Sequence, residues 1–191
     1  MLFSDKINQA IRVAACAHEG QYRKGSAIPY IFHPYAVALI SQKYYEDEKV
    51  FIACLLHDVL EDVPTKVYSR DDMAKDFGAD ILSIVDDVSE PKLIGMKDVW
   101  QARKDAYIDH LATVADIRPL IVSTSDKIHN MSEMIREHGE RGVQIWDSFY
   151  ADRAKEIWFY EAVYDVLKEK SLPPVAMEDY AAILAKLEEL K

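Results

Sequence analysis

Residues 54–62, Cys-Leu-Leu-His-Asp-Val-Leu-Glu-Asp, contain four polar side chains that can perform acid–base or metal chemistry. His57 and Asp58 are adjacent, Glu61 follows Asp58 by three residues, and Asp62 follows it by four. On one continuous helix these spacings place the four groups on one side, a turn apart. Their neighbours are apolar, so the helix is predicted to be buried, where an acid is costly unless paired or bound to metal. The segment is therefore a candidate site.

Two residues from other segments extend this cluster into a candidate ligand set. His33 precedes Pro34 at the start of a predicted helix, and Asp126 lies on another predicted helix. With His57 and Asp58 they offer two imidazoles and two carboxylates, a set that suits Mn²⁺, Fe²⁺ or Zn²⁺ better than Mg²⁺ or Ca²⁺. No local spacing links the three segments. From the residues alone, a helix-capping role for His33 and a buried ion pair between His57 and Asp58 stay open.

The elements that would position these groups are predicted to be helical almost throughout. Apolar residues recur at helical spacing, and no alternating strand pattern, repeat or low-complexity tract is apparent, so the predicted fold class is all-α. Helices are expected from Ser4 to near Gly20, from Pro34, over 49–62, from Ser69 with a break at Gly78, over 97–114, from Pro119, and over 175–190. Residues 20–31 and 89–96 are expected to be loops.

Composition restricts the class of protein further. A chain of 191 residues, half of them apolar, is long enough for one domain with a real core. Lys and Arg number 23 against 33 Asp and Glu, and a net charge of −10 opposes non-specific nucleic-acid binding. An anionic ligand would therefore need a local basic pocket or a metal. No apolar run approaches the roughly 18–20 residues of a membrane span, and no signal-peptide pattern is present.

The two cysteines, Cys16 and Cys54, lie among apolar residues and are expected to be buried free thiols. Two cysteines do not make a disulfide framework. With no membrane span or signal peptide expected, the protein is predicted to be cytoplasmic. Homo-oligomer formation stays possible.

Four ordered motifs resemble the HD-type hydrolase domain of RelA/SpoT enzymes and their small stand-alone relatives, the alarmone hydrolases of the stringent response. The resemblance covers about residues 5–165, and its motifs occupy 17–25, 29–34, 55–62 and 125–131. It implies an HD-domain helical bundle over residues 1–170, with 171–191 as a C-terminal helical extension. It also implies a hydrolase, usually Mn²⁺-dependent, that removes the 3′-pyrophosphate of (p)ppGpp and yields GDP or GTP plus pyrophosphate.

The resemblance also implies roles for the cluster described first. The matching metal ligands are His33, His57, Asp58 and Asp126. Glu61 and Asp62 match the family's catalytic acid pair, which positions and deprotonates the attacking water. For these two acids the alternative is a solvated helix end before Pro64. Their register with the His57-Asp58 pair favours the catalytic role.

Further residues match positions that contact the nucleotide in the family. Arg23 and Lys24 lie in such a loop, where a guanidinium can stack on a purine and an ammonium can meet phosphate. The alternative for them is two exposed loop cations. Asn130, one helical turn after Asp126, is expected to reach ribose or phosphate. Lys127 is also a candidate, although the longer enzymes usually have Arg there.

The sequence departs from the family pattern over residues 89–104, where the family supplies cations near the pyrophosphate. Lys92, Arg103 and Lys104 are the candidates here. The departure leaves the substrate open between (p)ppGpp and a close purine analogue such as (p)ppApp. An HD phosphohydrolase acting on another nucleotide or phosphate ester is the first alternative. A nucleotide-binding regulatory module without catalysis is the second, which the intact acid pair and ligand set disfavour.

Several aromatic and histidine side chains are predicted to be structural. Helical spacing assigns core positions, rather than base stacking, to Trp146, Phe149, Tyr150, Trp158, Phe159 and Tyr160. His18 is expected to pack near the site or support it. His110, His129 and His138 are expected at the surface or in structural roles. Tyr30 either packs on the base or braces its loop.

Overall fold

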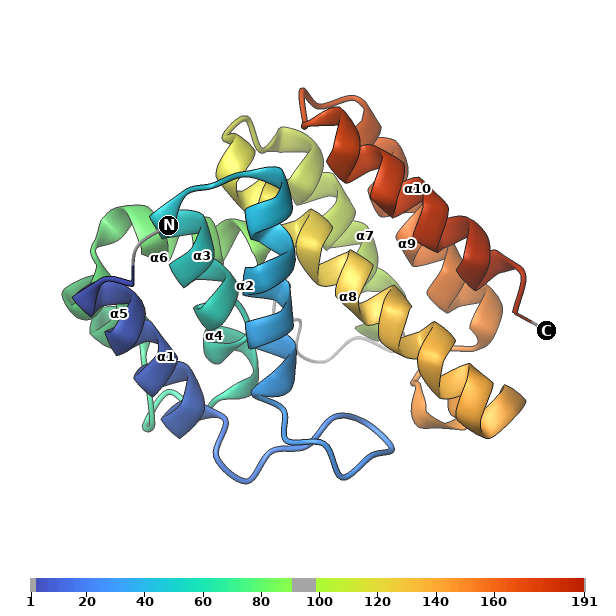
Figure 1. Ribbon diagram of the computed structural model, residues 1–191, viewed down its shortest axis with the longest axis horizontal. Coiled ribbons are helices and arrows are strands. Elements are labelled where there is room, and N and C mark those ends of the chain that lie inside the picture. Colours follow the sequence, from blue (N-terminus) through green and yellow to red (C-terminus); the bar gives the residue numbers. More distant parts are fainter. Residues whose placement is uncertain (1–2, 91–98, 191) are drawn as a thin grey trace.

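Helices account for nearly all regular structure in residues 3–90 and 99–190, the part of the chain that the computed structural model describes (Figure 1). They are α1 (Asp5–Ala17), α2 (Phe32–Tyr44), α3 (Glu48–Leu56), α4 (Val59–Asp62), α5 (Arg70–Phe77), α6 (Ala79–Val88), α7 (Val99–Thr113), α8 (Ile117–Arg141), the 3₁₀ helix η1 (Gly142–Ser148), α9 (Arg153–Lys168) and α10 (Pro174–Glu188). Within these residues no strand forms, and β pairing is limited to an isolated bridge between Tyr22 and Pro29. The predicted all-α class is confirmed.

Side-chain caps fix several helix starts at the expected residues. The Ser4 hydroxyl accepts a hydrogen bond from the amide of Ile7 at 3.1 Å, at the start of α1. Ser69 and Asp72 cap each other reciprocally at the start of α5. Gly78, with φ of 89°, separates α5 from α6, because residues with a side chain rarely adopt that conformation.

The Ser69 cap supports a stability prediction. Replacing Ser69 with alanine removes the acceptor of the Asp72 amide, so we expect a loss of about 1 kcal/mol. For a chain of this size that lowers the melting temperature by roughly 2–4 °C, which calorimetry measures. Ser171→Ala, at an exposed position between α9 and α10, is the matched control and should leave the melting temperature unchanged. Equal melting temperatures for both variants would contradict the assigned cap.

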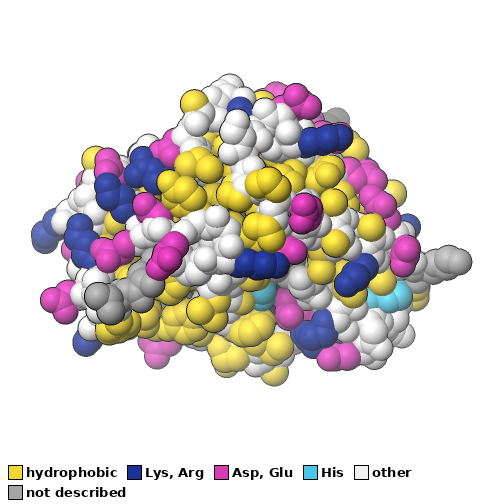
Figure 2. Space-filling model, turned by 45° about the horizontal axis from the view of Figure 1, so that its top comes forward, with side chains coloured by type: hydrophobic (Ala, Val, Ile, Leu, Met, Phe, Trp, Pro, Cys, Tyr) yellow, Lys and Arg dark blue, Asp and Glu magenta, His cyan; other side chains and the backbone are white. Residues whose placement is uncertain are grey.

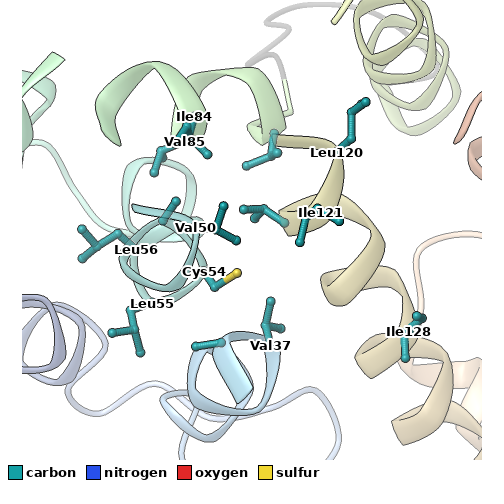
Figure 3. Close-up of a cluster of buried hydrophobic side chains, with 14 of the residues drawn as sticks. Val37, Val50, Cys54, Leu55, Leu56, Ile84, Val85, Leu120, Ile121 and Ile128 are labelled. Carbon is teal, nitrogen blue, oxygen red and sulfur yellow. The ribbon is translucent and has the colours of Figure 1, made fainter. Parts of the chain in front are cut away.

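The core is centred on α3, which packs against α1, α2, α6 and α8. Six of its nine residues are buried: Val50, Ile52, Ala53, Cys54, Leu55 and Leu56. Figure 3 shows Val50 and Cys54 of α3 among Val37 of α2, Ile84 and Val85 of α6, and Leu120 and Ile121 of α8. Because other helices pack on several sides of α3, its C-terminal end is fixed in the interior. The residues that follow it, His57 and Asp58, therefore also lie in the interior.

The prediction of one continuous helix over 49–62 is wrong, because the helix is interrupted at His57 and Asp58 and forms α3 and α4 instead. His57 Nδ1 donates to the carbonyl of Cys54 at 2.8 Å, an oxygen that a continuing helix would offer to the amide of Asp58. The carbonyl of Asp58 then accepts from the amides of Glu61 and Asp62 at 3.2 and 2.9 Å, which starts α4. The break turns the polar groups towards neighbouring helices.

The long helix α8 lies between the α1–α6 region and α9 with α10 (Figure 1). The last helix, expected over 175–190, forms as α10 and packs on α8 and α9. Its Tyr180 hydroxyl donates to the carbonyl of Tyr160 at 3.0 Å. The division of the chain near residue 170 stays a prediction. In the described ranges no helix combines the length and apolarity that crossing a membrane would need.

One cysteine prediction is wrong. Cys54 is fully buried in α3, as expected, whereas Cys16 is exposed because it lies on the outer face of α1. The helix expected over 97–114 begins, within the described residues, at Val99. Tyr107 and Leu111 are buried in this helix, and Trp100 is only partly buried.

Candidate metal centre and its cavity

The four predicted ligands converge from three parts of the chain. His33 lies in the first turn of α2, His57 and Asp58 lie between α3 and α4, and Asp126 lies in α8. The Nε2 atoms of His33 and His57 are 3.3 Å apart. His33 Nε2 is 3.0 Å from Asp126 Oδ1, and His57 Nε2 is 3.2 Å from Asp58 Oδ2. The donor atoms of His33, His57 and Asp58 all lie within 4.8 Å of one another.

The orientation of both imidazoles fits a metal ion. His57 Nδ1 faces the Cys54 carbonyl and His33 Nδ1 faces His129 Nδ1, each at 2.8 Å. In both residues the Nε2 atom is therefore directed at the shared centre. Two imidazole nitrogens and two carboxylates form a mixed donor set that suits a divalent transition metal. The site can hold such an ion, and the role of each ligand stays a prediction.

The charges of the cluster also favour a cation. Burial alone would lower the pKa of His57, but Asp58 and Asp126 outweigh it and raise that pKa to about 9. Burial would likewise raise the pKa of Asp126, yet Lys127 and the two histidines hold it well below its usual range. In the absence of a metal, the centre therefore retains a proton near neutral pH. A divalent ion would take the place of that proton.

This competition predicts a pH dependence of metal binding. His57 must release its proton to act as a ligand, so the apparent Mn²⁺ affinity should rise between pH 6 and pH 9. Displacement of one proton gives about a tenfold gain per pH unit below the pKa. Calorimetric titration at several pH values measures the affinity, and the dependence of the heat on the buffer reports the released proton. An affinity that stays flat from pH 6 to pH 9 would contradict the protonated centre.

The acid pair lies beside the centre. Glu61 Oε1 accepts a hydrogen bond from the amide of Glu90 at 2.5 Å. Burial, followed by the charge of Asp58, raises the pKa of Glu61 to about 8. Asp62 is the more exposed of the two acids. A carboxylate with a pKa near neutrality is suited to exchanging protons with water.

Tyr30 and His18 brace the site from the 18–31 loop. The Tyr30 hydroxyl donates to Asp58 Oδ2 at 2.6 Å, so this side chain orients a predicted ligand. His18 is buried, its ring lies 4.8 Å from that of Tyr30, and its Nδ1 is 2.7 Å from Gln21 Oε1. Gln21 Nε2 in turn donates to the carbonyl of Asp62 at 3.2 Å. The loop and the acid pair are therefore held together.

A cavity of about 440 Å³ opens on the centre, and this volume is typical of small-molecule sites. The four predicted ligands and the acid pair line it, together with six predicted substrate contacts: Arg23, Lys24, Arg103, Lys104, Lys127 and Asn130. Lys92 lies outside the described residues. On the face shown in Figure 2, basic side chains are interspersed with acidic ones. The cavity lining likewise places its lysines and arginines among more numerous acids.

Several of these predicted contacts also interact with the protein's own side chains, and two of them hold Asp126. Lys127 Nζ donates to Asp126 Oδ2 at 2.6 Å and lies 4.8 Å from the Tyr107 ring centroid. Asn130 Nδ2 donates to Asp126 Oδ1 at 2.6 Å, and Asn130 Oδ1 accepts from Arg23 at 2.8 Å. Asn130 thus links a predicted ligand to the loop cation, a role beyond the expected contact with ribose or phosphate.

Sequence reasoning did not single out the acids of the cavity wall. Glu90 forms an ion pair with Lys104, and its Oε2 is 3.8 Å from Arg103 Nε. Glu133, Glu137 and Glu156 also line the cavity. No motif marks these residues, because each reaches the cavity only through the packing of α6, α8 and α9.

The aromatic residues are divided between core and cavity. Phe159 and Tyr160 are buried as predicted, and both also line the cavity. The core prediction is wrong for Tyr150, which is 87% exposed, with Lys24 Nζ 5.2 Å from its ring centroid. Helical spacing does not apply there, because η1 ends at Ser148 and α9 begins at Arg153. His129 is buried beside His33, so its structural assignment is compatible with a place at the centre.

The fold and the site together define a class of protein, namely all-helical domains in which histidines and aspartates cluster at one centre. A family model described as HD domain matches residues 10–157. That match extends over more than half of the chain, so the protein belongs to the HD-domain family. The predicted HD-domain bundle is confirmed.

Curated proteins similar in sequence support the predicted resemblance to RelA/SpoT enzymes. The guanosine-3′,5′-bis(diphosphate) 3′-pyrophosphohydrolase of Haemophilus influenzae is 40% identical over 124 residues, which are 62% of this chain and 17% of the relative. The bifunctional (p)ppGpp synthase/hydrolase SpoT of Escherichia coli K12 is 38% identical over 127 residues, which are 66% of this chain and 18% of the relative. A GTP pyrophosphokinase of Myxococcus xanthus is 30% identical over 194 aligned positions, which cover 98% of this chain and 25% of the relative. The chain spans a quarter or less of these relatives.

Solved structures share the fold. One belongs to work on a metazoan SpoT ortholog that hydrolyses ppGpp. It has a TM-score of 0.80 at 24% identity and covers 100% of this chain and 99% of its own. A second, from Listeria monocytogenes EGD-e, has a TM-score of 0.69 at 23% identity, and the match covers 85% of this chain and 99% of that structure. At identities below 25%, this likeness shows that the fold is shared and nothing further.

Proposed function

We propose that this protein is a metal-dependent hydrolase that removes the 3′-pyrophosphate of (p)ppGpp or of a close purine analogue. The observation that carries the proposal is that the predicted ligand set, the acid pair and six predicted substrate contacts line the same cavity. Relatives named for (p)ppGpp hydrolysis support the choice of substrate. The donor set favours Mn²⁺ or another divalent transition metal.

The proposed reaction is attack of water on the phosphorus bonded to the 3′ oxygen. His33, His57, Asp58 and Asp126 would hold a divalent ion, which would supply Lewis acidity that acidifies water and withdraws charge from the phosphoryl oxygens. Glu61 accepts the proton of the attacking water, and the amide of Glu90 holds its carboxylate in place. The bond between phosphorus and the 3′ oxygen breaks, and that oxygen takes up a proton from solvent, to which Glu61 returns the proton of the attacking water. The products are pyrophosphate and GDP or GTP.

The cations of the cavity divide between two tasks. Lys127 is buried and bonded to Asp126, so it stabilises the centre and offers positive charge close to the reacting phosphorus. Arg23 and Lys24 lie on the loop at the cavity and would contact the nucleotide from that side. Their planar and point charges suit the base and the phosphates respectively.

Hydrolysis of another nucleotide or phosphate ester is the second candidate, and the acidic wall of the cavity favours it. Glu90 already pairs with Lys104, and Glu133, Glu137 and Glu156 add negative charge. Such a wall tolerates a ligand with fewer phosphates better than one with two diphosphates, because like charges repel. The metal chemistry is the same in both candidates.

Turnover of ppGpp by the purified protein with Mn²⁺ is the test. The proposal expects GDP and pyrophosphate as products, identified by chromatography, and no reaction with GDP or GTP. Parallel assays with ppApp decide between guanine and adenine. Absence of turnover with both alarmones, while Mn²⁺ binds, would overturn the alarmone proposal in favour of another phosphate ester.

A further inference from the structure

We infer that His129 is a positioning residue for the metal centre, which keeps His33 in the tautomer and ring orientation that a metal ligand needs. His33 Nδ1 and His129 Nδ1 are 2.8 Å apart, and the ring centroids are 4.9 Å apart. The exposed fractions of the two residues are only 1% and 5%, so water cannot readily replace this contact. The inference rests on the proposed function only in requiring that the centre binds a divalent ion.

The direction of this hydrogen bond follows from what surrounds the other nitrogen. His33 Nε2 lies 3.3 Å from His57 Nε2 and 3.0 Å from Asp126 Oδ1, in the middle of the predicted ligand set. A nitrogen that binds a metal must present its lone pair, so the hydrogen of neutral His33 lies on Nδ1. His129 Nδ1 is therefore the acceptor. Ligating histidines generally donate their second N–H to a carboxylate, a backbone carbonyl or water. Here an imidazole nitrogen occupies the place of that acceptor.

The two ligand histidines differ in what holds them. His57 Nδ1 donates to the backbone carbonyl of Cys54, an acceptor that no substitution at that position removes. For His33 the acceptor is a side chain, so a single substitution can remove it. The site thus contains its own comparison between a backbone partner and a side-chain partner.

The position of His129 is itself constrained. It lies on α8 three residues after Asp126, so one helix carries both a predicted ligand and the group that orients another. The ring of Phe32, which precedes His33 in the chain, packs edge-on at 5.3 Å from the His129 ring. With Phe32 on one side and His33 on the other, the imidazole of His129 has little freedom to turn.

The test compares His129→Asn with His129→Leu. Asparagine and leucine have nearly the same shape, but only asparagine carries an oxygen, Oδ1, that can accept from His33 Nδ1 as the histidine does. We expect Mn²⁺ affinity, measured by calorimetry without nucleotide, to fall by roughly 10–100-fold in His129→Leu. It should stay within about threefold of wild type in His129→Asn. The visible spectrum of the Co²⁺-loaded protein should change only in His129→Leu.

A purely structural role would give a different pattern. Melting temperatures of the metal-free proteins reveal loss of packing, and His129→Ala is a second variant without an acceptor should His129→Leu fail to fold. Equal Mn²⁺ affinity in wild type and the variants without an acceptor would overturn the inference. Equal weakening in His129→Asn and His129→Leu would overturn it too, as would a wild-type protein that binds no divalent ion. Because no substrate is used, failure of ppGpp turnover would leave the result unaffected.

Discussion

Replacing Asp58 with alanine is expected to lower Mn²⁺-supported turnover of ppGpp by about 10³-fold or more. A metal contributes several kcal/mol of transition-state stabilisation, and each 1.4 kcal/mol corresponds to about a factor of ten in rate. The substitution removes a predicted ligand whose Oδ2 lies 3.2 Å from His57 Nε2 and 3.5 Å from His33 Nε2. It also leaves the Tyr30 hydroxyl without its acceptor.

Two controls make the Asp58 result specific. Asp58→Asn keeps an oxygen for Tyr30 but removes the negative charge, so it should bind Mn²⁺ weakly and remain nearly inactive. Asp109→Ala, at an exposed position of α7, should keep the wild-type rate. Turnover and Mn²⁺ affinity are measured on the same preparations. Full activity of Asp58→Ala would exclude this residue from the metal centre.

Replacing Glu61 with glutamine is expected to reduce kcat by about 10²–10⁴-fold while Mn²⁺ affinity stays within a few-fold of wild type. Glutamine has the same size, and its Oε1 can still accept from the amide of Glu90, so the local structure is retained. What it loses is the ability to take a proton from water. A fall in kcat at constant metal affinity separates the proton acceptor from the ligands.

The Glu61 experiment also decides between enzyme and binding module. A regulatory module without catalysis predicts that Glu61→Gln leaves function unchanged. Asp62→Asn is the neighbouring comparison, and Glu161→Gln, exposed on α9, is the control without a predicted role. Wild-type turnover in Glu61→Gln would show that the proton is accepted elsewhere.

Local signals in the sequence were sufficient for most of the helices. Ser4 and Ser69 accept from backbone amides at helix starts, and Gly78 supplies a backbone conformation that ends a helix, so these boundaries depend on nearby residues alone. The boundary at His57 was missed because it depends on a side chain that binds the carbonyl of Cys54. Helical periodicity continues through that break and does not report it.

The cavity depends on tertiary packing to a greater extent. His33, His57 and Asp126 were gathered by matching motifs, since no spacing in the chain brings three separate helices together. Glu90 and His129 belong to the same surroundings, but Glu90 stands at the edge of a predicted loop and His129 looks like an ordinary helical histidine. Only the crossing of α2 and α8 places His129 against His33.

The burial of α3 has a consequence for how the protein loses its site on heating or in denaturant. Its residues Ile52 to Leu56 are at most 1% exposed, and they lead directly into His57 and Asp58. Amide hydrogens in such a helix exchange with solvent only when the whole domain opens. Fraying of α1 or α10 would therefore leave the centre intact. A bound ion would raise the free energy of the opening that permits exchange throughout α3, and it would do so by the full free energy of its binding.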